Sequence, residues 1–85
     1  MKYSYEEGNF KQGDILSIQI DRRANIYLLD RLNFNRYKSN QTCEYYGGTS
    51  NTSPYNIKVP RTGHWYIVID LGRGVSYFHI SVIHQ

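Results

Sequence analysis

The stretch Gly63-His64-Trp65-Tyr66-Ile67-Val68-Ile69-Asp70-Leu71-Gly72 (GHWYIVIDLG) decides the fold. Successive side chains of a strand point to opposite faces, and the run from position 65 to 69 is apolar throughout, which is typical of a strand buried on both faces. We therefore predict a central strand at residues 65–70, with Trp65 in the core. One face carries Trp65, Ile67 and Ile69, and the other carries His64, Tyr66, Val68 and Asp70.

Short β-prone segments surround this strand, and turn residues separate them. No long window shows the 3.6-residue period of an amphipathic helix. The segments follow one another too closely for parallel crossover connections. The sequence therefore predicts an all-β fold, a small antiparallel β-sandwich (jelly-roll-like or a partly open barrel) of about seven short strands. We expect strands at residues 3–10, 15–20, 24–29, 42–46, 55–59, 65–70 and 75–83.

The connections are predicted from their turn residues. Gly47-Gly48 should end the strand at 42–46, and Pro60-Arg61-Thr62-Gly63 fits a β-turn. Residues 30–40 form a long polar loop, in which Asp30 could cap a short helical turn. Residues 71–74 are predicted to be a glycine-containing hairpin loop. The first strand is expected to be weak, because Glu6-Glu7-Gly8 interrupts it.

The composition indicates one globular domain. The chain has 85 residues, of which 40% are hydrophobic and 20% charged, which argues against disorder. We therefore treat residues 1–85 as a single domain. Cys43 is the only cysteine, so no intramolecular disulfide can form, and a reducing compartment fits best. The start of the chain lacks a signal-peptide pattern, and the longest apolar run is too short for a membrane span. We predict a cytoplasmic protein.

The residues that could support catalysis or metal binding do not show the necessary spacing. His79 and His84 lie an odd number of residues apart on one predicted strand, so they should face opposite sides. His64 and Asp70 could form an acid–base pair, but six residues of strand place them roughly 20 Å apart. Cys43 is expected to be a small buried or half-buried residue on a strand. We therefore predict no catalytic residues, no metal site, no cofactor and no enzyme activity.

Nucleic-acid binding is an alternative. The net charge of +3 and the nine tyrosines would suit a small barrel that binds single strands. However, the basic residues and tyrosines are scattered along the chain, and no RNA-recognition motif is present.

Three segments in order resemble a known family. They are residues 29–37 (LDRLNFNRY), the Tyr45-Tyr46-Gly47-Gly48 run with Ser53-Pro54 after it, and residues 59–72 (VPRTGHWYIVIDLG). From about Gly13 onward the chain resembles a family of small bacterial all-β proteins, numbered domain of unknown function 1883. Two departures stand out. Arg73 replaces the second glycine of a usual DLGG, and the first ten residues match poorly.

The resemblance implies a β-sandwich without an established activity. Members of the family stand alone or accompany other domains, among them Toll/interleukin-1-receptor-like signalling domains, which would suit a sensing or interaction module. We expect a non-catalytic module that binds a protein or a small molecule through its polar loops, with a possible homodimer through edge strands. The expected ligand-binding residues are Asn33, Phe34, Arg36, Tyr37, Tyr46, Gly47, Gly48, His64 and Asp70.

Overall fold

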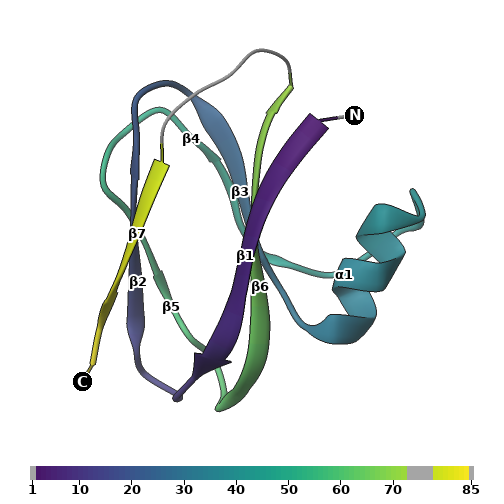
Figure 1. Ribbon diagram of the computed structural model, residues 1–85, viewed down its shortest axis with the longest axis horizontal. Helices are drawn as coiled ribbons and strands as arrows, with labels where there is room; N and C mark the ends of the chain where they lie inside the picture. Colours follow the sequence, from purple (N-terminus) through teal and green to yellow (C-terminus); the bar gives the residue numbers. More distant parts are fainter. Residues whose placement is uncertain (1, 73–77, 85) are drawn as a thin grey trace.

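The computed structural model describes residues 2–72 and 78–84, which form two antiparallel sheets and one helix. One sheet has the strand order β1-β6-β3-β4 and the other has the order β5-β2-β7. Figure 1 shows the two sheets face to face, with the helix on the outer side of the four-stranded sheet. This confirms the predicted all-β sandwich, with a helix as a third layer. The elements are β1 (Lys2–Phe10), β2 (Ile15–Ile20), β3 (Ala24–Leu29), α1 (Arg31–Lys38), β4 (Tyr46–Ser50), β5 (Tyr55–Lys58), β6 (Gly63–Gly72) and β7 (Phe78–Ile83).

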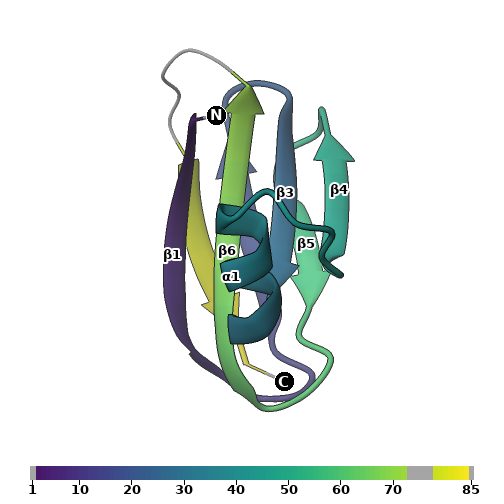
Figure 2. The ribbon, with the colours of Figure 1, turned by 90° about the vertical axis from the view of Figure 1, so that its right-hand side faces the viewer.

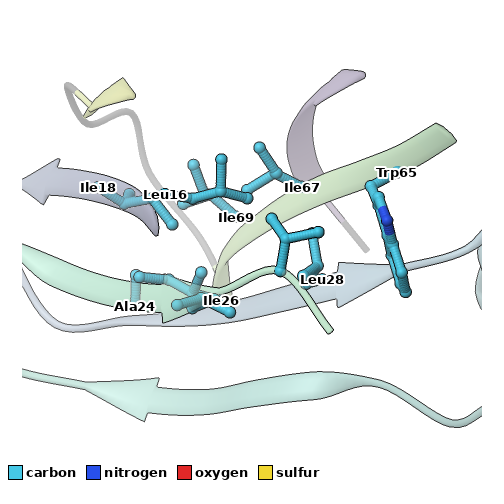
Figure 3. Packing of buried hydrophobic residues seen from close by; sticks show 10 residues of the cluster. Leu16, Ile18, Ala24, Ile26, Leu28, Trp65, Ile67 and Ile69 are labelled. Carbon is cyan, nitrogen blue, oxygen red and sulfur yellow. The ribbon is translucent and has the colours of Figure 1, made fainter. Parts of the chain in front are cut away.

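The main core lies between the two sheets (Figure 3). Alternate residues of β2, β3 and β6 point into it, as period-2 patterning requires. Burying an aliphatic or aromatic side chain of this kind contributes about 1.5–3 kcal/mol, so this layer supplies most of the stability. Its buried members are Leu16, Ile18, Ala24, Ile26, Leu28, Ile57, Val59, Trp65, Ile67 and Ile69.

Strand β6 lies between β1 and β3 and is buried on both faces. Trp65 is only 2% exposed and belongs to the main core, as predicted. The opposite face of β6 carries Tyr66 and Val68, which pack with Leu29 and Phe34 in a second cluster on the outer side of the sheet. The central strand was therefore predicted correctly, including the division of its side chains between two faces.

Helix α1 replaces the loop predicted at residues 30–40. Asp30 caps its first turn, because its side chain accepts a hydrogen bond from the Asn33 main-chain N–H at 2.9 Å. Phe34 is buried and stacks on Tyr66, with ring centroids 4.1 Å apart. Figure 2 shows the helix lying over β6. The predicted cap at Asp30 is correct, but the helix is longer than the predicted turn. The local sequence does not show that Phe34 packs on a distant strand and so stabilises the longer helix.

Two predicted strand boundaries were wrong. Residues 41–45 are irregular, and Gly47 and Gly48 lie inside β4, where they pair with Tyr27 and Ile26. Gly47 has φ +120°, and a β-carbon there would clash with the main-chain oxygen of Ile26, so glycine permits this close approach. Strand β1 is continuous, because it pairs with β6 from Lys2 to Phe10 and this pairing overrides the Glu6-Glu7-Gly8 interruption.

The predicted hairpin at 71–74 and the predicted last strand at 75–83 are only partly covered by the described residues. The last strand is described from Phe78 onward, and Leu71 and Gly72 belong to β6, so the loop predicted to begin at residue 71 was wrong at these two positions. The rest of the hairpin predicted at 71–74, and the beginning of the strand predicted at 75–83, lie outside the described residues. In the part of the chain that the structure describes, no helix is long and apolar enough to cross a membrane.

Candidate functional site

A pocket of about 490 Å³ opens beside the N-terminal end of α1. Its walls come from three places in the sequence: the β3–α1 junction, the irregular segment before β4, and the bend between β5 and β6. The fold brings these parts together because α1 lies on the four-stranded sheet, and the chain then returns along β4. The lining residues are Leu28, Asp30, Asn33, Cys43, Glu44, Tyr45, Tyr46, Arg61 and Trp65.

Asp30 joins two walls of this pocket. Its Oδ1 accepts hydrogen bonds from the main-chain N–H and the Nδ2 of Asn33, both at 2.9 Å. Its Oδ2 accepts from Nη2 of Arg61, also at 2.9 Å. Burial raises the pKa of Asp30, but the donors of Asn33 and Arg61 outweigh it and hold the pKa below its ordinary value. The carboxylate is therefore charged at neutral pH and fixes both the helix and Arg61.

Arg61 is positioned from two sides. Its guanidinium lies over the Trp65 ring, 4.7 Å from the centroid, while its main-chain oxygen accepts a hydrogen bond from Trp65 Nε1 at 3.0 Å. The Arg61 side chain is still 56% exposed. Of its five N–H donors, the described residues engage only those on Nη2, through Asp30. Arg61 therefore presents a pre-oriented cation with donors available to the pocket.

The segment before β4 supplies the aromatic wall. The main-chain N–H of Glu44 donates to Oδ1 of Asn33 at 2.9 Å, which ties the segment to the helix. Tyr45 packs against Tyr27, with ring centroids 4.5 Å apart, and Tyr46 lies edge-on to Trp65 at 6.0 Å. Both tyrosines remain about half exposed, at 49% and 47%. Two supported aromatic rings therefore face solvent beside the pocket.

Of the nine predicted ligand-binding residues, the structure places Asn33 and Tyr46 in this pocket. Phe34 and Tyr37 instead point toward the sheet, where Phe34 is buried and the Tyr37 hydroxyl donates to Asp70 Oδ2 at 3.0 Å. Burial, and then the Asp70 carboxylate, raise the pKa of Tyr37 well above its usual value. Phe34, Tyr37 and Asp70 therefore hold the helix on the sheet.

The other predicted residues do not line the pocket. Arg36 is exposed on α1, and Gly47 and Gly48 are part of the β3–β4 ladder. His64 lies at the start of β6, where its Nε2 is 3.0 Å from Glu7 Oε1 and its Nδ1 is 3.2 Å from Asn9 Oδ1. His64 and Asp70 thus have different neighbours.

The described residues contain no group of three or more His, Cys, Asp or Glu side chains suited to a metal ion. His84 Nδ1 instead lies 3.2 Å from the buried Asp14 Oδ2. The Lys11 main-chain N–H, which donates to the same oxygen, is the main reason that the pKa of Asp14 is lowered. Cys43 is half-buried as predicted, but it lies in the irregular segment and lines the pocket.

Comparison with known proteins identifies the family. A family model described as a domain of unknown function, DUF1883, matches residues 1–85, the whole chain. The chain belongs to the DUF1883 family. The match includes the first ten residues, which were expected to match poorly, and of these Lys2–Phe10 form the edge strand β1 of this DUF1883 chain. No curated protein and no solved structure shows significant similarity to it.

Most of the pocket residues of this DUF1883 chain were missed at the sequence level. They are Leu28, Asp30, Cys43, Glu44, Tyr45, Arg61 and Trp65. The helix cap at Asp30 and the turn at Arg61 were each visible as local signals. Nothing local indicated that the two side chains form an ion pair, because their distance in sequence hides the contact. A polar residue in a turn directly before the strongest strand is the signal that could have drawn attention to Arg61.

Asp30→Ala should destabilise this DUF1883 chain by about 0.5–2 kcal/mol near neutral pH, because the helix loses its cap. The difference from wild type should shrink as pH falls. The lowered pKa of Asp30 contributes stability above its unfolded-state pKa, and this is lost once pH falls through the folded-state value. Urea unfolding at several pH values measures both effects. Asp21→Ala is the control, since that carboxylate is exposed and lies 4.0 Å from Arg22. Equal effects of the two variants would contradict the assigned role.

Proposed function

We propose that this chain is a non-catalytic binding module that takes a small polar ligand in the Asp30–Arg61 pocket. The observation that carries this proposal is Arg61, which is held by Asp30 and Trp65 yet more than half exposed toward a pocket. A surface arginine that served only solubility would need no such support. Pre-orientation reduces the entropy lost on binding, which is what a recognition site requires.

The lining indicates the chemistry of the ligand. Asp30 and Glu44 are acidic and Arg61 is basic, so the lining carries a single net negative charge, and no strongly charged ligand is favoured. Arg61 offers donors and the Glu44 carboxylate offers acceptors, while the exposed faces of Tyr45 and Tyr46 suit a ring with an apolar side. A hydroxylated ring compound, such as a sugar, combines these features.

A thermal-shift screen tests the proposal, with sugars, nucleotides, metal ions and short oligonucleotides as separate arms. We expect stabilisation by a sugar-like compound, since a ligand of the folded state raises the melting temperature. No stabilisation by any compound would overturn the proposal. Stabilisation by oligonucleotides alone, lost as salt increases, would instead favour the single-stranded nucleic-acid alternative.

Arg61→Gln should lower the affinity for the compound found in this screen about tenfold or more, because a hydrogen bond from a charged donor contributes about 1.5–3 kcal/mol. Isothermal titration or two-dimensional NMR measures the loss. Arg36→Gln is the matched control, since Arg36 is an exposed arginine of α1 outside the pocket lining. Unchanged affinity in Arg61→Gln, or equal losses in both variants, would contradict binding in this pocket.

We also infer a bacterial cytoplasmic location. The support is the family resemblance together with the single cysteine, which suits a reducing compartment. Subcellular fractionation of the host with an antibody against the chain tests this, and recovery outside the cytoplasm would contradict it.

A further inference from the structure

The outward edge of β7 differs from the other three sheet edges. The two sheets end at β1 and β4 and at β5 and β7, so each of these strands has one edge unpaired among the described residues. An unpaired edge presents free N–H and C=O groups that can bind another strand, and proteins usually block such edges.

Three of the edges carry blocking features. Strand β1 contains Glu6 and Glu7, whose like charges would oppose pairing with a second copy of the strand. In β4, Gly47 and Gly48 have positive φ values of +120° and +150°, which depart from regular strand geometry. Strand β5 has only four residues, includes Lys58 and lies between Pro54 and Pro60.

Strand β7 has none of these features. Its six residues, Phe-His-Ile-Ser-Val-Ile, include no Lys, Arg, Asp, Glu, Pro or Gly. Because N–H and C=O groups alternate in direction along a strand, every second residue turns its backbone groups away from β2. The β7 edge is therefore a regular, uncharged pairing surface.

The side chains of β7 that face the core are also incompletely covered. Phe78, Ile80 and Val82 pack against the main core but remain half-buried. Figure 2 shows β1 and β7 on the same side of the sandwich. The residues of β1 that face inward, opposite Ile69, Ile67 and Trp65, are Ser4, Glu6 and Gly8. They are polar or lack a side chain, so apart from Phe10, which lies opposite Gly63 and packs against the main core, the inward face of β1 offers no apolar side chain to cover β7.

We propose that two copies of this chain associate through antiparallel pairing of their β7 strands about a two-fold axis. The pairing would join the two three-stranded sheets into one continuous sheet of six strands, and it would bring the half-buried apolar faces of both β7 strands together. A strand that carries no charge meets no electrostatic repulsion from its own copy.

The alternation of side chains restricts the register. Residues directly opposite in an antiparallel pair share one face of the sheet, so Phe78, Ile80 and Val82 must lie opposite these same positions in the second copy. Ile80 opposite Ile80 of the second copy, with Phe78 opposite Val82, meets this condition. His79 then lies opposite Ser81, on the outer face of the sheet.

Sedimentation equilibrium measures the association at protein concentrations from about 1 µM to 1 mM. This range suits a small interface made by two six-residue strands. The mass of wild type should rise from 10.0 kDa toward twice that value. His79→Lys/Ser81→Lys should remain monomeric, or associate at least tenfold more weakly, because each lysine would face another. Asn51→Lys/Asn56→Lys is the control, with the same added charge on exposed residues outside β7, in the β4–β5 connection and in the opposite edge strand β5. It should dimerise like wild type.

Hydrogen exchange of the wild type provides a second measurement that needs no variant. Alternate amides of β7 should gain protection as concentration rises and lose it on dilution. A constant 10.0 kDa mass at every concentration, or protection that appears in β1, β4 or β5 instead of β7, would overturn the proposal. Equal association of the two lysine variants, with both confirmed as folded by circular dichroism, would also overturn it.

Discussion

Trp65→Ala should remove a large fraction of the stability of the folded protein. Removing a buried tryptophan costs about 3–5 kcal/mol, because the transfer free energy is lost and a cavity remains in the core. A domain of this size has roughly 0.05–0.15 kcal/mol of stability per residue, so this loss is a large fraction of the total. The Trp65 ring also supports the Arg61 guanidinium and the Tyr46 ring, so the pocket should lose two of its walls.

Chemical denaturation followed by far-ultraviolet circular dichroism measures this loss without relying on tryptophan fluorescence. Trp65→Phe is the control, because it keeps an aromatic ring in the core and removes the hydrogen bond from Nε1 to the Arg61 main-chain oxygen. We expect it to cost about 1 kcal/mol from that bond, plus the smaller ring volume. A stability of Trp65→Ala within about 1 kcal/mol of wild type would contradict the central position of this side chain.

Phe34→Ala should detach helix α1 from the sheet, at a loss of about 3–5 kcal/mol. Phe34 is 3% exposed and is the buried residue of the helix, where it stacks on Tyr66. An isolated helix of eight residues is too short to persist in water, so without this contact it should melt. The Asp30 cap would then have no helix to stabilise, and Asn33 would no longer hold the segment before β4.

Leu32→Ala is the matched control for Phe34→Ala, since Leu32 lies on the same helix but is 59% exposed. It should change stability by no more than about 0.5 kcal/mol. Hydrogen exchange measured by NMR separates local from global effects. Loss of protection in α1, with the main-core strands still protected, is the pattern expected for Phe34→Ala. Similar behaviour of the two variants would show that the helix does not depend on Phe34.

The sandwich could be predicted because its strands follow a local rule. Alternation along residues 15–20 and the apolar run at 65–69 indicate buried faces without knowledge of any partner strand. Helix α1 could be anticipated only as far as its cap. Asn33 and Asn35 favour the helix weakly, and the exposed Leu32 breaks the apolar stripe that would have identified an amphipathic helix. Phe34 stabilises the helix through Tyr66, which lies far along the chain.

The pocket was harder to predict than the fold, for the same reason. Asn33 and Tyr46 were expected to bind a ligand because they lie in polar connections, and both line the pocket. Phe34, Tyr37 and Asp70 were expected to do so as well, but the helix turns Phe34 and Tyr37 onto the sheet, where the Tyr37 hydroxyl donates to Asp70 of β6. Which side chains of a connection face solvent depends on how the connection packs, and residues 30–40 do not reveal this by themselves.

Asp30 divides its carboxylate between the helix and the pocket, and this arrangement has a thermodynamic consequence. One oxygen holds the first turn of α1 and the other holds Arg61. A ligand that draws Arg61 away from Asp30 therefore changes the environment of the carboxylate that caps the helix. Linkage is reciprocal, so if such a ligand loosens the helix by a given factor, the protein with a loosened helix must bind that ligand more tightly by the same factor. Binding in the pocket and the order of helix α1 are therefore thermodynamically coupled.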